Sequence, residues 1–478
     1  MKRFILALCV LLCVLSGCAK KHGAALLDPK SPVTVTVWHY YNGIQQTQFD
    51  EMVRSFNETA GAEQGIIVEA KSKNSVGELA DSVVASVNNE PGADDPPDIF
   101  ATYAETAYQL DKQDMLVDLS QYLTAEERAE YVEAYLDEGS LGQEGALKIF
   151  PTAKSTEVFI LNKTDWEKFA DAAGISYDDL TTWESLAEVA AQYYDYTDAL
   201  TPDVPNDGKA FFGRDAVANY LIVGAKQLGH PFAEAGVDGS VTVNADKDTL
   251  RTLWDNFYVP FVKGYYAAES RFRSDDAKTG RITALIGSTS GATYYPTEVT
   301  INDEYTYPIE NEVLPVPSFT GCEPWVVQQG AGMSVLTSDE KTEYACTVFL
   351  KWFTETDRNL TFSLGSGYLP VKKAANDYAA IEARSADLAI SDTMLSTFRV
   401  ATAEIASHQL YTSPPFDHSA DMRDYMESSM QGAASDCEAA RARIAGGEDR
   451  ETVWAEYTGD EAFEAWYANF STGLKAFQ

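Results

Sequence analysis

Cysteine is scarce in this sequence of 478 residues, with six in total, three of them near the N-terminus. The other three, Cys322, Cys346 and Cys437, are few and widely spaced. They are too few for the dense disulfide framework of small secreted domains, and a single disulfide between two of them is the alternative. The sequence has no Cys-x-x-Cys pair, which argues against a structural zinc site. We therefore expect no metal and no cofactor.

Basic residues are also few, since 36 Lys and Arg stand against 73 Asp and Glu and give a formal charge of −37. Nucleic-acid binding requires clustered Lys and Arg against the phosphate backbone, so we expect no nucleic-acid partner. A strongly acidic surface keeps a protein soluble beside a membrane. Aromatic residues, by contrast, make up 12% of the chain. Such rings suit the faces of sugar rings as well as a protein core.

The apolar run at the N-terminus, Phe4 to Leu15, is too short to span a bilayer and follows Lys2 and Arg3. This pattern is typical of a signal peptide. The run ends in Leu-Ser-Gly-Cys, a lipobox pattern that predicts a signal peptide at 1–17, lipid attachment at Cys18 and a tether at 18–32. An ordinary secretory signal is the alternative. With a lipid anchor the protein is expected on the extracellular face of a bacterial cytoplasmic membrane.

Strand and helix patterns alternate in the first hundred residues after this segment. Residues 33–38 alternate valine with threonine and predict a strand, and residues 65–70 and 98–101 predict two more, each followed by a helical period. Three such units indicate an α/β fold with a mostly parallel sheet. Ligands bind beyond the carboxyl ends of parallel strands. The aromatic residues at these ends, Trp38 to Tyr40 and Tyr103, are therefore candidate ligand contacts.

Several segments, taken in order, resemble a known family. They are "VWHYYNG", "KSTEVFILNKTDW" followed by "TTWESLAE", "GRITALIGSTSG", "QQGAGMSV", "VFLKWFT" and "GYLPVKKAA". Together they resemble the extracellular solute-binding proteins (family 1) of bacterial ABC importers, in the group that binds sugars and glycerol 3-phosphate. The resemblance implies an α/β fold of the type II periplasmic-binding-protein class, with a ligand cleft between two lobes joined by a hinge with several chain crossings. It implies lobe one at 33–153 plus 284–327, and lobe two at 154–283 plus 328–478.

The resemblance also implies a set of ligand-binding residues. In relatives the tyrosine of the "GYLP" segment touches the solute, so Tyr368 is expected to do so here, and the alternative is a tyrosine that fills a helix end behind Gly367. The full expected set is Trp38, His39, Tyr40, Tyr103, Lys154, Ser155, Thr156, Ser288, Thr289, Ser290, Gln329, Gly330 and Tyr368. Hydroxyls, amides and backbone N–H groups suit a polyol, because they donate to and accept from sugar hydroxyls without requiring charge.

The sequence departs from the glycerol-3-phosphate binders at two places. Lys154 stands where they carry a serine, and Asp421 stands where an arginine grips phosphate, with Arg423 nearby but out of register. Loss of a bidentate phosphate clamp weakens a phosphorylated ligand strongly. We therefore expect a carbohydrate, a mono- or oligosaccharide, with a phosphorylated polyol such as glycerol 3-phosphate as the alternative.

Two segments of the sequence resemble sites of other kinds. "GSTSG", 287–291, resembles a nucleophile elbow, but Thr289 occupies the place of the serine. Chance carboxylate pairs keep a secreted glycoside-active hydrolase as the lesser alternative. Residues 244–255 resemble a calcium loop without its glycine, and a helix cap explains them better. We therefore expect a monomeric receptor without enzyme activity. Its expected partners are the solute and the permease and ATPase subunits of an importer. A sensor built on the same fold is a further alternative.

Overall fold

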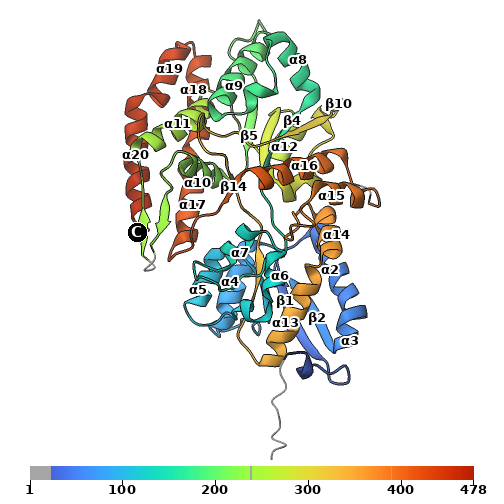
Figure 1. The fold of residues 1–478 in the computed structure, drawn as a ribbon. Helices are drawn as coiled ribbons and strands as arrows, with labels where there is room; N and C mark the ends of the chain where they lie inside the picture. Colours follow the sequence, from blue (N-terminus) through green and yellow to red (C-terminus); the bar gives the residue numbers. More distant parts are fainter. Residues whose placement is uncertain (1–22, 237–239, 389) are drawn as a thin grey trace, which may run out of the picture.

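The computed structural model describes residues 23–236, 240–388 and 390–478, which fold into two lobes stacked along one long axis (Figure 1). Lobe one is the lower body in that view and holds most of the N-terminal third of the chain. Lobe two is the upper body and holds the C-terminal helices. The predicted two-lobe α/β fold is confirmed.

A four-stranded sheet with the order β13-β3-β1-β2 forms the centre of lobe one. β1 pairs in parallel with β2 and β3, and β13 runs antiparallel to β3, so the predicted mostly parallel sheet is confirmed. The strands are β1 (Val33–His39), β2 (Ile66–Ser72), β3 (Ile99–Thr102) and β13 (Gly332–Val335). The helices are η1 (Gly23–Leu26), α2 (Gly43–Phe56), η2 (Asn57–Gly61), α3 (Ala62–Gln64), α4 (Val76–Val87), α5 (Ala104–Asp111), η3 (Leu119–Tyr122), α6 (Ala125–Ala129), α7 (Glu133–Gly139), α13 (Glu340–Phe353) and α14 (Thr356–Ser366).

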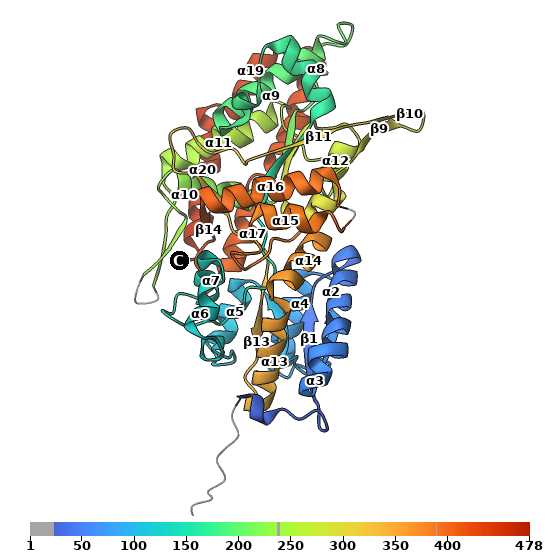
Figure 2. The same ribbon diagram turned by 45° about the vertical axis from the view of Figure 1, so that its right-hand side comes forward.

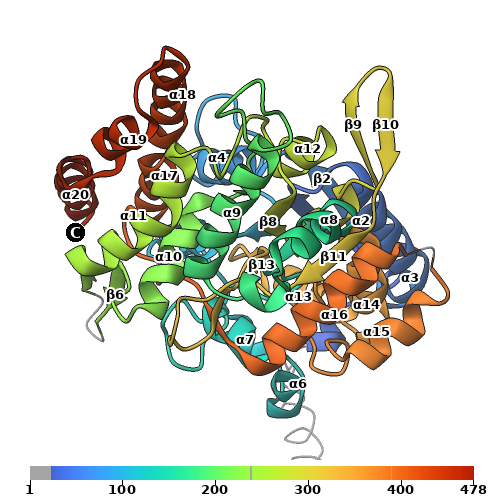
Figure 3. The same cartoon turned by 90° about the horizontal axis from the view of Figure 1, so that it is seen from above.

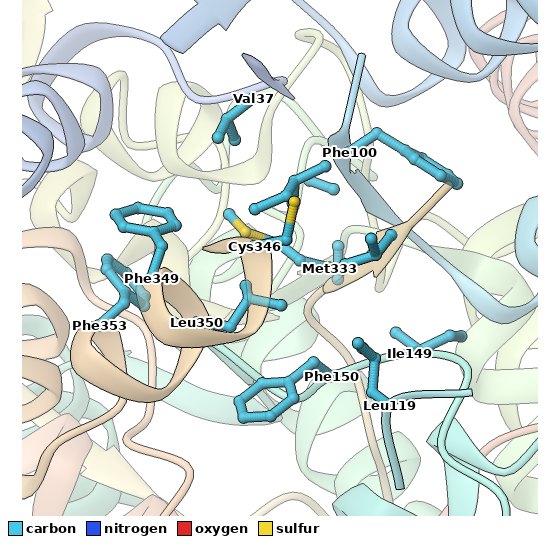
Figure 4. Packing of buried hydrophobic residues seen from close by; sticks show 14 of the residues in the cluster. Val37, Phe100, Leu119, Ile149, Phe150, Met333, Cys346, Phe349, Leu350 and Phe353 are labelled. Carbon is cyan, nitrogen blue, oxygen red and sulfur yellow. The ribbon is translucent and has the colours of Figure 1, made fainter. Parts of the chain in front are cut away.

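The core of lobe one forms where apolar helix faces meet this sheet (Figure 4). On α13, Cys346, Phe349 and Phe353 recur at helical spacing and are fully buried. They pack toward Val37 of β1 and Met333 of β13. Burial of this stripe, rather than intrinsic helix propensity, holds α13 on the sheet.

A second four-stranded sheet, with the order β11-β4-β8-β5, forms the centre of lobe two. β4 runs antiparallel to β8 and β11, and β5 is parallel to β8. Its strands are β4 (Glu157–Asn162), β5 (Phe212–Arg214), β8 (Ala284–Ser288) and β11 (Asn311–Leu314). Three small two-stranded sheets pair β6 (Ala233–Ala235) with β7 (Val241–Val243), β9 (Glu298–Asn302) with β10 (Tyr305–Pro308), and β12 (Trp325–Val327) with β14 (Gln409–Tyr411).

Helices surround the second sheet, and the last four lie on one side of the lobe (Figure 3). The β9–β10 hairpin projects from the opposite side (Figures 2 and 3). The helices of lobe two are α8 (Lys163–Ala173), η4 (Tyr177–Leu180), α9 (Trp183–Asp198), α10 (Val217–Gln227), α11 (Lys247–Val262), α12 (Arg273–Lys278), η5 (Thr289–Tyr294), α15 (Tyr378–Ser385), α16 (Asp392–Ser407), α17 (Ser419–Ser429), α18 (Gly432–Ala445), α19 (Arg450–Thr458) and α20 (Asp460–Lys475).

Three chain segments lie side by side where the chain passes between the lobes. Lys154 pairs with Leu369 and Ser155 pairs with Gln329, each in an antiparallel bridge. Gly330 has a φ of 85°, and a Cβ there would come within 2.6 Å of the Ala153 carbonyl oxygen, so only glycine permits this close approach. These segments form the hinge.

The division of the chain between the lobes differs from the expected one. Residues 284–327 were expected in lobe one, but β8 and β11 pair with β4 in the sheet of lobe two. Conversely, β13 and α13 lie in lobe one, although residues 328–478 were expected in lobe two. The sequence pattern identifies strands but not their partners, because pairing is a long-range contact.

The start of the described chain is attached to lobe one. Residues 18–32 were expected to be a tether, but η1 packs on α13, and Lys341 donates to the Ser31 carbonyl at 3.0 Å. Cys18 and the predicted signal peptide lie outside the described residues. Within the described ranges no helix is long and apolar enough to cross a membrane. Cys322, Cys346 and Cys437 are all free thiols.

Candidate functional site

A cleft of about 470 Å³ lies between the lobes, with walls from lobe one, the hinge and lobe two. Its position at the hinge means that any molecule held there contacts both lobes. Its lining consists of Val76, Gly77, Ala80, Tyr103, Glu105, Thr106, Asn219, Ile222, Val327, Gln328, Gln329, Thr412, Ser413, Ser419, Ala420, Met422, Arg423, Asp424 and Met426. Hydroxyl, amide and charged side chains outnumber the apolar ones, while apolar atoms make up most of the exposed surface, so the cleft combines hydrogen-bonding groups with apolar contact area.

The wall from lobe one is built at the carboxyl end of β3, as parallel sheets predict. Tyr103 follows the strand as the N-cap of α5, in extended backbone, and its side chain makes no capping hydrogen bond. Glu105 and Thr106 lie in the first turn of that helix and line the same cleft. Burial raises the pKa of the Glu105 carboxyl, with the nearby Arg423 guanidinium opposing the shift. An aromatic face and a carboxylate therefore stand together on this wall.

The wall from lobe two is formed mainly by α17 and α10. Arg423 on α17 donates to the Asn219 side-chain oxygen at 2.6 Å. The Asn219 amide donates to Glu157 at 2.7 Å, and the Arg214 guanidinium donates to the other Glu157 oxygen at 2.6 Å. This buried chain of charge-assisted hydrogen bonds fixes the guanidinium of Arg423 at the cleft. Asp421 is exposed and contacts His418 at 3.0 Å, so Arg423 and not position 421 supplies the side chain on this wall.

Ser419 opens α17 in the same wall and is 6% exposed. Its hydroxyl makes no hydrogen bond to any residue that the structure describes. A buried hydroxyl without a partner costs about 1 to 3 kcal/mol, so such groups are normally paired with water or with a ligand. Of the buried side-chain groups without a partner among the described residues, Ser419 is the one that lines this cleft, which makes it a candidate ligand contact.

Two of the thirteen expected ligand-binding residues, Tyr103 and Gln329, line this cleft. Ser155, Thr156, Lys154 and Gly330 belong to the hinge instead, and all four are buried.

The aromatic residues after β1 lie behind the cleft. His39 is packed between Tyr41 and Phe49, with ring centroids 5.2 and 4.8 Å away, and desolvation lowers its pKa to about 4. Tyr40 shares a hydrogen bond of 3.3 Å with the Tyr368 hydroxyl. These residues belong to the core of lobe one and do not line the cleft.

Two further expected residues, Trp38 and Tyr368, lie outside the cleft as well. Trp38 is covered by the Lys73 ammonium, 3.6 Å from its ring centroid. Tyr368 is 4% exposed, stacks on Phe362 and follows Gly367, whose φ of 80° ends α14. That arrangement matches the alternative of a tyrosine filling a helix end.

The serine and threonine residues of 288–290 lie at the end of β8 and the start of η5. The Ser288 and Ser290 hydroxyls contact each other at 2.9 Å, and Thr289 is fully buried. Gln45 of lobe one donates to the Ser290 carbonyl at 3.4 Å. This segment therefore contributes to the contact between the lobes and not to the lining of the cleft.

Sequence reasoning missed most of the lobe-two wall. Arg423 was noticed but placed out of register, and Ser419, Asn219 and Asp424 were not singled out. The sequence did contain a signal for this wall. The two prolines Pro414 and Pro415 precede a helix that carries Ser419 and Arg423 one turn apart, and so on the same face.

No group of three or more His, Cys, Asp or Glu side chains is placed to hold a metal ion in the described part of the chain. In the segment that resembles a calcium loop, the Asp246 side chain accepts from the backbone N–H of Thr249 at 2.9 Å and caps α11. The helix-cap interpretation of 244–255 is therefore confirmed.

The fold of the chain is shared with several solved solute-binding structures. The cyclic α-maltosyl-1,6-maltose binding protein of Arthrobacter globiformis is 17% identical, with 92% of this chain and 100% of that chain covered and a TM-score of 0.62. UgpB of Mycobacterium tuberculosis in complex with glycerophosphocholine is 17% identical, with 94% and 98% covered and a TM-score of 0.65. An ABC substrate-binding protein of Listeria monocytogenes in complex with cycloalternan is 16% identical, with 94% and 100% covered and a TM-score of 0.65. At these identities the likeness concerns the fold.

Membership of a family follows from the sequence itself. No curated protein matches the chain. The profile of the bacterial extracellular solute-binding proteins matches residues 51–389, which include the four-stranded sheet of lobe two, every strand of the lobe-one sheet except β1, and the three hinge segments. The chain therefore belongs to the bacterial extracellular solute-binding proteins.

Proposed function

We propose that this protein is the lipid-anchored receptor of an ABC importer and that it captures a carbohydrate in the cleft between its lobes. The observation that carries the proposal is the cleft itself, which is bounded by both lobes and the hinge and lined by hydroxyl and amide groups, with an unpaired buried hydroxyl at Ser419. A solute that touches both lobes only when they are close together favours the closed form. The closed form then docks on the permease, whose ATPase drives transport. The receptor is monomeric and has no catalytic activity of its own.

The carbohydrate assignment has support from the side chains of the cleft. Tyr103 offers an aromatic face, and Glu105, Asp424 and Gln329 offer planar acceptors of the kind that bind vicinal hydroxyls. Two of the structural neighbours named above are described as binding an oligosaccharide.

A phosphorylated polyol is the second candidate, and one observation favours it. Arg423 lines the cleft and is held there by Asn219, so a guanidinium is available to an anion even though position 421 is an aspartate. A further neighbour is described in complex with glycerophosphocholine.

A thermal-shift screen of the chain from residue 23 separates these candidates, because a ligand bound only by the folded state raises the melting temperature. The panel contains mono- and oligosaccharides, polyols and their phosphates. Neutral sugars are expected to stabilise the protein, and Ser419→Val is expected to reduce that shift. If only phosphates stabilise the protein, the phosphorylated polyol becomes the first candidate. If no compound of the panel raises the melting temperature, both candidates are contradicted.

Lipid attachment at Cys18 is tested separately in cells. Radiolabelled palmitate is expected to label the wild-type protein and not Cys18→Ser, which is expected to leave the membrane fraction. Equal labelling of both proteins would contradict the anchor. Co-purification with permease subunits tests the importer assignment against a sensor on the same fold.

A further inference from the structure

Gln328 lies where the hinge meets the cleft. It directly follows β12, its backbone N–H donates to the Tyr411 carbonyl at 2.8 Å, and it contributes to the lining of the cleft. The residue is 5% exposed, so its side chain has few positions open to it. The atoms around its amide therefore decide which end of the amide a solute meets.

Both hydrogens of the Gln328 amide face groups of α7. The amide nitrogen donates to the Ala134 carbonyl at 3.3 Å and to the Glu138 carboxylate. A carbonyl and a carboxylate only accept hydrogen bonds, so rotating the amide by half a turn would set its oxygen against two other acceptors. The chemistry of the neighbours thus fixes the orientation, and the side-chain oxygen is the atom that accepts no hydrogen bond from the described residues.

Glu138 is held in turn by Lys154. The Lys154 ammonium lies 2.6 Å from the Glu138 carboxylate and 2.7 Å from the Gly330 carbonyl oxygen. Its side chain is 2% exposed and that of Glu138 is 7% exposed. A buried pair of this kind keeps its geometry, because separating the two charges leaves each without compensation. Lys154, Glu138 and Gln328 therefore form one connected unit, the hinge cluster.

We propose that Glu138 is a positioning residue that turns the carbonyl oxygen of Gln328 toward the solute, so that the cleft selects a hydrogen-bond donor at this point. This inference rests on the proposed function and specifies it further. The solute presents a hydroxyl to Gln328, and a phosphate or carboxylate oxygen at the same place meets a second acceptor and is disfavoured. Glu105 and Asp424 on the walls add to the same preference. Gln328 thus contributes a preference for neutral sugars over their phosphates, which the Arg423 guanidinium on the lobe-two wall opposes.

The first test needs no solute. In wild-type protein carrying ¹⁵N in its glutamine side chains, both amide protons of Gln328 are expected to exchange with water at least tenfold more slowly than those of the exposed Gln109, since each donates to a buried acceptor. The double variant Lys154→Met/Glu138→Gln removes the two charges together and gives Gln328 a neighbour that also donates. Its Gln328 protons are expected to exchange faster. Exchange in the wild type as fast as at Gln109 would overturn the inference.

The second test measures selectivity with two matched pairs, glucose with glucose 6-phosphate and trehalose with trehalose 6-phosphate. Calorimetry is expected to show the ratio of neutral to phosphorylated affinity falling about tenfold in the double variant, because the Gln328 amide is no longer held in one orientation and can also offer a donor to the solute. Gln328→Met, which has neither donor nor acceptor, is expected to weaken the neutral sugar without improving the phosphate.

The outcomes separate the two claims. If none of the four probes binds the wild type, the carbohydrate proposal is contradicted, and the exchange experiment alone decides the orientation of Gln328. If a sugar binds and the double variant keeps the wild-type ratio, the receptor proposal stands and the positioning role of Glu138 is wrong.

Discussion

The hinge cluster and the cleft are neighbours, yet they treat polar groups in opposite ways. In the hinge, Lys154, Glu138 and the Gln328 amide nitrogen have partners within the chain, and the charges are buried. In the cleft, the Ser419 hydroxyl is buried without one, and Glu105 makes no ion pair within the described residues. The charged groups of the hinge cluster are thus satisfied within the chain, whereas the Ser419 hydroxyl at the cleft is not.

Mutations in the two regions should therefore affect different quantities, namely stability in one region and affinity for the solute in the other. Changes that leave a hinge charge unpaired or remove a ring from the core should act mainly on the free energy of unfolding, whereas changes at or directly behind residues that line the cleft, Gln328 included, should act on affinity.

The largest effect is expected from Lys154→Met, which leaves the Glu138 carboxylate buried without its cation. Removing one partner of a buried ion pair costs about 3 to 5 kcal/mol. Urea unfolding followed by circular dichroism measures this loss. The double variant Lys154→Met/Glu138→Gln is the control and should recover most of it, because no uncompensated charge remains. An unchanged urea midpoint for Lys154→Met would mean that the pair contributes nothing.

Tyr368 and Tyr103 provide the next contrast, because one tyrosine belongs to the core of lobe one and the other lines the cleft. Tyr368→Ala removes a ring from the core of lobe one and the partner of the Tyr40 hydroxyl, so it should cost about 3 kcal/mol of stability. Tyr103→Ala removes an aromatic face from the cleft and should weaken solute binding about tenfold.

Each variant is to be measured by both urea unfolding and calorimetry with the solute found in the screen. The reverse pattern, in which Tyr368→Ala binds weakly but unfolds normally, would restore Tyr368 to the role that the resemblance implied.

A pH effect of somewhat smaller size is expected from His39 in the core. Burial lowers its pKa to about 4, and the Tyr41 backbone N–H donates to its Nδ1 at 3.2 Å, which requires the neutral ring. The unfolded chain takes up the proton near pH 6.5 and the folded chain does not, so stability is complete above that pH and falls as pH drops toward 4. The loss at pH 4 is about 2 to 3 kcal/mol.

The matching measurement compares urea unfolding of the wild type and His39→Asn between pH 7 and pH 4. The variant should lose less stability over this range, since its side chain does not titrate. Parallel curves would show that other groups account for the pH dependence.

Much of the fold followed from the sequence because its signals are local. The alternating strand at β1, the apolar stripe of α2 and the helix cap at Asp246 all depend on neighbours in the chain. Boundaries were less exact. The strands expected at 65–70 and 98–101 begin and end one or two residues later, as Ile66–Ser72 and Ile99–Thr102.

The site was harder to predict, because a cleft depends on which strands pair across long distances. Tyr103 was found since it ends a parallel strand, which is a local rule. Tyr368 and Lys154 were misplaced since a glycine-flanked tyrosine and a lysine look the same in sequence whether they face a ligand or a buried partner. Ser419 carried no signal until its missing hydrogen bond could be seen.

The smallest effect is expected at the contact across the cleft between Lys112 of lobe one and Asp417 of lobe two. The ammonium lies 2.8 and 2.6 Å from the two carboxylate oxygens, but both side chains are exposed, so water and salt screen the pair. Lys112→Glu should shift the open–closed equilibrium toward the open form by a factor of about two to three at low salt and hardly at all at 1 M salt.

Distances between spin labels on the two lobes measure that shift without any solute. The charge-swapped variant Lys112→Asp/Asp417→Lys should restore the wild-type distribution, whereas Lys154→Met/Glu138→Gln should leave its salt dependence intact. If the charge swap does not restore the wild-type distribution, the Lys112–Asp417 contact is a result of closure and does not stabilise the closed form. The open–closed equilibrium is then set by the hinge and the solute alone.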